Sequence, residues 1–365
     1  MDKPFGMMGL FEVVKMIVSM MPYGKVMKFA NEMTVAEFAE QFSSPYLRES
    51  FREMLSADTM SMAAILFTFA GLHNGSSGYP VGGSLAFAKG IERRLTELGG
   101  KVRYNTPVKE IRVDAGNASG VILENGEEIP ADYVISAMDL YTALEKLLGG
   151  RLKGSPYEKY FRNEKPFPSC VQVSLGVDMD FSNEPDYLTL SLPLEDPVSV
   201  GGREFHSIEF KHYAFDPTLA PEGKTVVEVI YMSDNFEYWE ELYSDPNAYK
   251  QEKERILSVT LDALEKRFPG IKNKVEQSDV ATPMTYVRYT NNWKGSFMTW
   301  ISTPENYKTL RQVPNRLPEI DNLYFSGMWI MAPGGLPTGV KTSRDILQLI
   351  CKKEGREFAT MKDVK

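Results

Sequence analysis

Cysteine and histidine are scarce in this chain of 365 residues. The two cysteines, Cys170 and Cys351, stand far apart and form no C-x-x-C pair. They give no support to a disulfide framework or a zinc site, and a reducing cytoplasm is the expected compartment. The three histidines, His73, His206 and His212, have neither metal-ligand nor catalytic-triad spacing, so we expect ordinary loop or strand roles for them.

Several longer patterns are missing as well. No segment reaches the ~18 uninterrupted apolar residues of a membrane-spanning helix, and the longest apolar run, 60–72, predicts a buried helix. Neither the phosphate loop G-x-x-x-x-G-K-[ST] nor the dinucleotide fingerprint G-x-G-x-x-G occurs. The net charge of −8 argues against nucleic acid as the main partner. Because no side-chain cluster is present to carry chemistry, we expect a bound cofactor to supply it.

Residues 322–350 predict a strand, a loop and a helix. The apolar and aromatic run 323–325 suits a buried strand, and the loop after it is rich in glycine and proline. Helical spacing follows, with Thr342 or Ser343 as the expected N-cap. This arrangement directs free backbone N–H groups and the positive end of a helix dipole at a ligand. By pattern alone, an ordinary strand–loop–helix connection fits equally well.

The block 79–139 predicts a helix followed by a β-meander and a buried strand. A short strand is expected at 101–104, directly after the helix. The Asn-Gly pair at 125–126 is a strong signal for a hairpin turn. Residues 131–137 form a near-continuous apolar run, typical of a strand buried on both faces. Asp139 is the expected cap of the next helix.

Residues 1–72 are expected to be helical. One face of the first helix is apolar, and its residues are Leu10, Val14, Ile17, Val18 and Met21. We favour a helix that lines the core or a cleft over one that lies on a membrane surface.

Other local signals predict an α+β region. Thr34 and Glu37 form a capping box. Residues 170–177 alternate strictly between apolar and polar or small side chains, which indicates a half-buried strand. Asp245 caps a long helix that begins at Pro246. Runs of strands with helices nearby favour an α+β domain.

Three groups of motifs occur in a fixed order along the chain. The first reads Y-P-x-G-G-S, G-G-x-V-x-x-N-T-x-V and A-D-x-V-I-S-A-x-D, the second T-P-x-T-Y-x-R-Y-T, and the third L-Y-F-S-G followed by a glycine–proline loop. The residues that carry them are Tyr79, Pro80, Gly82, Gly83, Ser84, Gly99, Gly100, Val102, Asn105, Thr106, Val108, Ala131, Asp132, Val134, Ile135, Ser136, Ala137, Asp139, Thr282, Pro283, Thr285, Tyr286, Arg288, Tyr289, Thr290, Gly295, Ser296, Leu323, Tyr324, Phe325, Ser326, Gly327, Pro333, Gly334, Gly335, Leu336, Pro337, Gly339 and Val340. In these motifs the sequence resembles the phytoene desaturase-like flavoproteins of the amine oxidase group.

The resemblance implies an α/β plus α+β fold with FAD as the cofactor. A Rossmann-like FAD/NAD(P)-binding domain would accompany a substrate domain of mixed or antiparallel sheet and helices. The implied layout has a helical part of the substrate domain at 1–78, the middle part of the nucleotide-binding domain at 79–139, the substrate domain at 140–317, and the C-terminal strand and helix of the nucleotide-binding domain at 318–365. The implied cofactor-binding residues are Val108, whose match contacts the adenine through its backbone, and a C-terminal group, Gly327, Met328, Gly334, Gly335, Leu336, Pro337, Thr338, Gly339 and Val340. The resemblance does not identify the catalytic side chains, and no metal site is expected.

The implied activity is that of a flavin-dependent oxidoreductase of the phytoene desaturase or retinol saturase type, acting on an apolar, carotenoid-like polyene. The nucleotide-binding domain reads as incomplete, because the family's first βαβ unit with G-x-G-x-x-G is not found, so we expect a truncated form that binds FAD weakly or not at all alone. The alternative is a non-catalytic remnant or binding subunit. Expected partners are an apolar small molecule, a membrane surface contacted peripherally from the cytoplasm, and an N-terminal nucleotide-binding unit in trans that would supply the FAD anchor.

Overall fold

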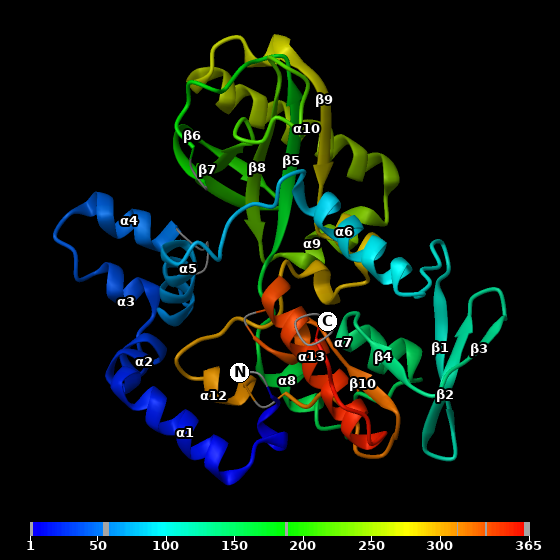
Figure 1. Ribbon diagram of the computed structural model, residues 1–365. Helices are drawn as coiled ribbons and strands as arrows, with labels where there is room; N and C mark the ends of the chain where they lie inside the picture. The colour runs from blue at the N-terminus through cyan, green and yellow to red at the C-terminus, as the bar shows by residue number, and fades with distance from the viewer. Residues whose placement is uncertain (1–2, 54–57, 187–188, 312, 333, 361–365) are drawn as a thin grey trace. The chain divides into compact units, whose positions relative to one another are not determined.

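The computed structural model describes residues 3–53, 58–186, 189–311, 313–332 and 334–360. Contacts divide the chain into two compact units (Figure 1). Unit 1 joins three segments, Met1–His73, Thr106–Phe167 and Met298–Lys365. Unit 2 joins two, Asn74–Asn105 and Pro168–Phe297. The units are defined by contacts and are cut at different residues from the functional domains expected from the sequence, whose bounds stay predictions.

Unit 1 combines two small sheets with helices from both ends of the chain. Its helices are α1 (Leu10–Met20), α2 (Gly24–Glu32), α3 (Val35–Ala39), α4 (Pro45–Glu53), α5 (Ala63–His73), α7 (Leu140–Thr142), α8 (Glu158–Asn163), α12 (Tyr307–Leu310) and α13 (Leu336–Lys353). Short helical turns are η1 (Phe5–Met7), η2 (Met21–Tyr23), the π-helix η3 (Ala143–Leu147) and η6 (Met328–Ile330). Its strands are β1 (Val108–Asp114), β2 (Asn117–Leu123), β3 (Glu128–Pro130), β4 (Val134–Ser136) and β10 (Leu323–Phe325).

The strand near the C-terminus pairs with the strand from the middle block. β10 runs parallel to β4, with Leu323 opposite Val134. All three residues of β10 are buried, as its apolar and aromatic composition predicts. The sequence predicts that residues 79–139 and 318–350 pack together. This is confirmed for their strands, whereas residues 79–105 belong to unit 2. β4 is shorter than the predicted 131–137, and Ile135 is 42% exposed, so only part of it is buried on both faces.

The meander and its helix follow their local signals. β1, β2 and β3 form an antiparallel sheet in chain order, with the Asn-Gly turn between β2 and β3. Gly126 adopts φ 85°, a conformation that favours glycine. Asp139 caps the next helix as predicted, because its carboxylate accepts the N–H of Thr142 at 2.8 Å.

The N-terminal helices start at their predicted cap, but they are less buried than expected. Thr34 Oγ1 accepts the N–H of Glu37 at 3.1 Å, and the Glu37 carboxylate accepts the N–H of Thr34 at 2.8 Å. α1 has no buried residue, and Leu10 is 83% exposed. The prediction of a core or cleft-lining first helix is therefore wrong, since no described element of unit 1 covers that face. In α5, Ile65 is buried but Phe67 is exposed, so the run 60–72 is only partly a buried helix.

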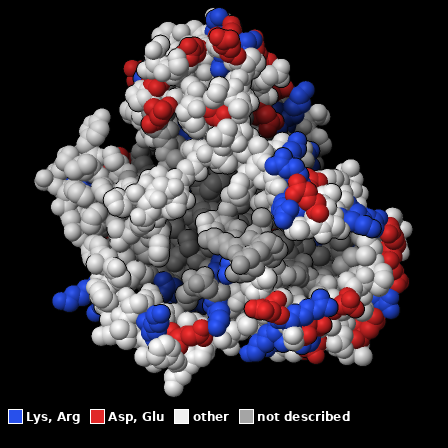
Figure 2. Space-filling model, in the orientation of Figure 1, with Lys and Arg blue, Asp and Glu red and all other residues white. Residues whose placement is uncertain are grey.

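The surface of unit 1 differs between its parts. Over α3, α4 and α5 the visible face shows few charged side chains, whereas the meander β1–β3 carries both signs (Figure 2). None of the helices within the described ranges combines the length and apolarity needed to cross a bilayer.

Unit 2 is an antiparallel sheet covered on one face by helices. Its strands are β5 (Ser169–Val177), β6 (Leu190–Val200), β7 (Arg203–His212), β8 (Thr225–Ser233) and β9 (Val275–Ala281), in the order β6-β7-β8-β5-β9. Its helices are α6 (Gly83–Glu97), α9 (Phe236–Tyr243), α10 (Pro246–Arg267) and α11 (Pro283–Thr290), with short turns η4 (Ile271–Lys274) and η5 (Trp293–Gly295). Alternate residues of β5 and β8 point into a core that includes Ile256 and Leu264 of α10. The predicted α+β character is confirmed here.

Residues 101–104 do not form the predicted strand. They are described, but no strand lies beside them to complete a ladder, and a strand without a hydrogen-bonded neighbour does not form. The helix before them, α6, forms as expected but has no buried residue. Its apolar face is exposed at Leu85, Ile91 and Leu95.

Candidate functional site

The C-terminal strand, loop and helix place a helix N-terminus next to the end of a buried strand. β10 ends at Phe325, and Ser326 donates its N–H to the carbonyl of Ser136 at 2.9 Å. Gly327 has φ 100° and turns the chain away from the strand into η6. α13 then begins at Leu336, with Gly335 as its N-cap and proline in its first turn. The predicted cap, Thr342 or Ser343, is therefore wrong by about two turns of helix.

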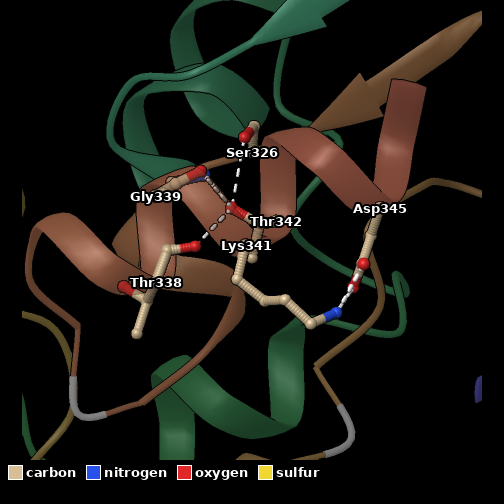
Figure 3. Close-up of polar contacts among 7 residues, drawn as sticks. Ser326, Thr338, Gly339, Lys341, Thr342 and Asp345 are labelled. Atoms are coloured by element: carbon tan, nitrogen blue, oxygen red, sulfur yellow. Dashed lines mark hydrogen bonds and ion pairs between the residues drawn. The ribbon is translucent and has the colours of Figure 1, made fainter. Parts of the chain in front are cut away.

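Thr342 instead holds the strand end against the helix (Figure 3). Its hydroxyl oxygen accepts the N–H of Gly327 at 3.0 Å and donates to the carbonyl of Thr338 at 2.9 Å. Ser326 Oγ lies 3.2 Å from the same hydroxyl and 2.8 Å from Ser343 Oγ. A threonine hydroxyl that donates to a carbonyl of its own helix usually destabilises that helix slightly. Here it satisfies a backbone N–H outside the helix, so the turn at Gly327 is fixed.

The glycines of the loop leave the backbone open on one side. A Cβ atom at Gly339 would meet no heavy atom within 4 Å, and one at Gly335 would meet only Pro337 Cδ at 3.8 Å. At Gly334 a Cβ would lie 3.1 Å from Met328 Cβ and 3.2 Å from Thr299 Cγ2. Gly334 is thus packed against its support, whereas Gly335 and Gly339 offer bare backbone to an approaching group. Pro333, part of the predicted loop motif, lies outside the described residues.

Two exposed apolar side chains flank this open backbone. Leu336 and Val340 are each 65% exposed, although they belong to the first turns of α13. Next to Val340, Lys341 forms an ion pair with Asp345 on the same helix (Figure 3). The first turn of a helix also has N–H groups without intrahelical partners. The arrangement suits a ligand with a flat apolar part and polar atoms that accept hydrogen bonds.

Aromatic side chains support the loop from the core of unit 1. Trp300 and Trp329 are buried with their rings perpendicular at 4.8 Å, and Phe161 packs on both. Thr299, next to Gly334, is fully buried, and its hydroxyl has no hydrogen-bond partner within the described residues. The described part of the loop is therefore supported by packed aromatic side chains, which hold its backbone in place before any ligand binds.

Val108 is not brought into contact with this loop. It is the first residue of β1, half-buried, and is paired with Leu123 of β2. The other predicted cofactor-binding residues lie in η6, in the described part of the loop after it and in the first turns of α13. The roles assigned to all of them by resemblance stay predictions.

The titratable groups of unit 1 are structural. Tyr133 donates its hydroxyl to Glu354 at the end of α13, and this bond raises the pKa of Tyr133 to about 12. Burial raises the pKa of Tyr157, whose hydroxyl donates to the carbonyl of Pro314 at 3.0 Å. No cluster of metal-ligating side chains occurs within the described ranges.

The histidines have roles close to those expected. His206 lies in β7, and His212, at its end, is buried with Nε2 3.1 Å from the carbonyl oxygen of Pro185. His73 ends α5, so it is a helix residue instead of a loop or strand residue.

A polar network on unit 2 was missed by sequence reasoning. Gln172 and Ser174 of β5 lie on the sheet face opposite the core, with Glu228 of β8 beside them. Gln172 Nε2 donates to Glu228 and to Ser174 Oγ, the latter at 3.1 Å. Tyr213 OH donates to the other Glu228 oxygen at 2.9 Å, and Tyr286 OH to Gln172 Oε1 at 3.1 Å. The partners are up to 114 residues apart, so no local signal reveals them.

Comparison with known proteins gives consistent results. The sequence profile of the family "Flavin containing amine oxidoreductase" matches residues 25–347. Prolycopene isomerase of Arabidopsis thaliana is 31% identical over 267 residues, which are 70% of this chain and 42% of that protein. A 4,4'-diapolycopene oxygenase of Methylomonas is 28% identical over 71% of this chain and 52% of its own length. The zeta-carotene-forming phytoene desaturase of Myxococcus xanthus is 25% identical over 73% and 51%. The chain thus spans about half the length, or less, of these relatives.

Solved structures show the same fold at low sequence identity. An oxidoreductase from Methanosarcina mazei superposes with a TM-score of 0.58 at 17% identity, over 94% of this chain and 74% of that one. A putrescine oxidase superposes with a TM-score of 0.53 at 14% identity, over 88% and 68%. The predicted fold class is confirmed by these likenesses and by the mixed helix and sheet described above.

Proposed function

The chain belongs to the flavin-containing amine oxidoreductase family. We propose that it carries the binding site for the flavin ring, here called the flavin seat, and the substrate domain of a flavin-dependent oxidoreductase. The observation that carries the proposal is the junction from β10 to α13, where open glycine backbone, a helix N-terminus and two exposed apolar side chains meet. The proposed substrate is an apolar polyene, in keeping with relatives named as carotenoid isomerase, oxygenase and desaturase.

The residues present fit the ring-bearing half of FAD. Gly335 and Gly339 have no side chain to keep a flat group from the backbone, and Leu336 and Val340 would contact its apolar part. The Gly327 turn is held by Thr342 whether or not a ligand binds. The sequence contains no G-x-G-x-x-G, the motif that binds the pyrophosphate half of FAD. Val108 would approach the adenine through its backbone.

A flavin bound there would accept or return a hydride equivalent, which is chemistry that no side-chain cluster of this chain provides. The chain's own residues would bind and orient the ring and exclude water from it. The aromatic bed under the loop supports this role, because a supported backbone keeps its hydrogen-bonding groups in place.

We also propose a nucleotide-binding unit as a partner in the assembly of this site. The sheet of β4 and β10 has only these two strands within the described residues, and two parallel strands are a minimal sheet. A βαβ unit, in the same chain or in trans, would pair with the sheet and supply the pyrophosphate turn.

A peripheral membrane contact is proposed for the first helix. Leu10 and Phe11 are more than three-quarters exposed, at 83% and 80%, and Lys15, Lys25 and Lys28 follow close in sequence. Apolar side chains beside lysines suit the interface of an anionic bilayer. Such a surface is where an apolar polyene would be taken up.

The test joins the chain to a nucleotide-binding unit and adds FAD and a polyene without oxygen. Bleaching of the visible flavin absorbance with a product that has an additional double bond, or a change in double-bond geometry without net bleaching, would support the proposal. A flavin-loaded assembly that leaves cis and trans carotenes unchanged would favour a non-catalytic binding role instead.

A further inference from the structure

A hollow on the outer face of the unit 2 sheet forms a separate cavity. Its volume is about 550 Å³, within the usual range of small-molecule sites. All of its lining residues belong to unit 2. The lining includes Ser174, Gly176, Leu219, Pro221, Val226 and Asp279.

The floor of the hollow is a gap in the sheet face. Gly176 lies on the same face as Ser174, opposite the core, and has no side chain to fill it. A Cβ at Gly176 would lie 3.4 Å from Gln277 Cβ of the neighbouring β9, an ordinary contact, so sterics do not require glycine there. The glycine therefore leaves space that a larger residue would occupy.

The wall of the hollow is a loop held by a buried carboxylate. Asp216 is 6% exposed and accepts the N–H of Gly82 at 2.7 Å and the hydroxyl of Thr218 at 2.6 Å. These bonds fix the loop that presents Leu219 and Pro221. The wall is thus apolar and pre-formed, which lowers the cost of ordering it around a ligand.

One end of the hollow has a hydrogen-bond donor, Ser174, beside an acceptor, Asp279. Ser174 Oγ accepts a hydrogen bond from Gln172, so its own O–H remains to donate. Asp279 stands opposite Ser174 in the ladder between β5 and β9, and its carboxylate only accepts when ionised. A donor and an acceptor side by side match a hydroxyl group, which can accept from Ser174 and donate to Asp279.

We propose that this hollow binds one end of an apolar molecule that carries a hydroxyl group. The apolar body lies over Gly176, against Leu219 and Val226, and the hydroxyl lies between Ser174 and Asp279. Binding of this molecule in the hollow does not rest on the proposed function.

The test compares a matched pair of fluorescent probes, pyrene-hexanol and hexylpyrene, binding to the full chain without flavin. We expect the alcohol to bind at least about threefold more tightly, because its hydroxyl makes two hydrogen bonds in the hollow. Ser174→Ala should reduce that preference, since only the bond to Asp279 remains, and Gly176→Val should weaken both probes. Ser191→Ala, in β6 outside the hollow, is the control and should change neither.

Circular dichroism and the melting temperature would show that each variant folds. Equal binding of the two probes to the unmodified chain, an unchanged preference in Ser174→Ala, or undiminished binding in Gly176→Val would each overturn the inference. None of these results bears on the flavin seat in unit 1. Conversely, the protein could fail to show flavin-dependent turnover and still prefer the alcohol probe. That result would reject the proposed function and support the inferred binding site in the hollow.

Discussion

The hydroxyl of Thr342, inside α13, accepts the backbone N–H of Gly327, at the end of β10, at 3.0 Å. Thr342 is 4% exposed, so water cannot replace this bond. The contact joins the two elements that frame the open glycine backbone. It makes the geometry of the proposed flavin seat a property of the folded chain.

Thr342→Val is expected to destabilise the chain by about 1 kcal/mol, because it removes the acceptor of the partly buried Gly327 N–H. Thr342→Ser keeps the hydroxyl and should lose only the packing of one methyl group. Urea unfolding of the two variants side by side measures the difference. Equal stability of Val and Ser variants would show that the bond contributes nothing.

Gly339→Ala should have opposite effects on folding and on flavin binding. The added Cβ meets nothing within 4 Å and favours the helix by about 0.5–1 kcal/mol. In the proposed site the same methyl group takes space that the flavin needs, so FAD affinity of the completed assembly should fall. Gly90→Ala in α6, also helical and open, is the matched control. It should stabilise without changing FAD affinity, and a Gly339→Ala variant with full affinity would contradict the assigned seat.

Residues 1–365 expressed alone are expected to bind FAD weakly or not at all. The sequence has the ring-side turn but no G-x-G-x-x-G for the pyrophosphate, which carries much of the affinity in such folds. Adding a nucleotide-binding unit, in cis or in trans, should restore a yellow protein. Gel filtration with absorbance detection distinguishes the cases. A monomeric product that keeps stoichiometric FAD through the column would refute this expectation.

Leu10→Ser combined with Phe11→Ser should reduce co-sedimentation with anionic vesicles by tenfold or more, since each buried side chain contributes roughly 1.5–3 kcal/mol. Both side chains are exposed in the free chain, so the melting temperature of the double variant should equal that of the unmodified chain. Tyr289→Ser, a 74% exposed aromatic of unit 2, is the control and should not alter sedimentation. Unchanged sedimentation of the double variant would rule out this helix as the membrane contact.

Cys170 should make stability fall at alkaline pH. Burial raises the pKa of its thiol from 9.0 to about 11. The folded state keeps the proton longer than the unfolded state, so the contribution is complete below pH 9 and is lost as the pH rises toward 11. The loss is roughly 1.4 kcal/mol per pH unit in that window. Cys170→Ala should show a shallower decline in urea unfolding than the unmodified chain, and Cys351→Ala should not.

The sequence predicts local features well because their causes are local. The capping box of Thr34 and Glu37, the caps at Asp139 and Asp245, and the alternation in β5 all form as expected. The sequence also predicts that the segments holding β4 and β10 pack together, whereas their parallel pairing is a finding of the structure.

Long-range features were harder to foresee. The start of α13 was placed too late, although Pro337 in its first turn is a signal for the true start. Residues 101–104 look like a strand, yet a strand needs a neighbour that a local pattern cannot supply. The exposure of α1 depends on which element covers it, and the bond from Gln172 to Glu228 joins different strands.

The pairing of β4 with β10 also sets an order of folding. The strands of the unit 2 sheet lie between β4 and β10 in the chain. Pairing β4 with β10 therefore closes a loop that contains this whole sheet, and we expect this pairing to form late. Unit 2 builds its own sheet largely from strands close in sequence. On the ribosome, its strands β5–β9 would emerge and fold while the N-terminal helices still lack their C-terminal neighbours. Pulsed hydrogen exchange should therefore protect β8 before β4, and the exposed N-terminal helices would be the part of the nascent chain most open to chaperones.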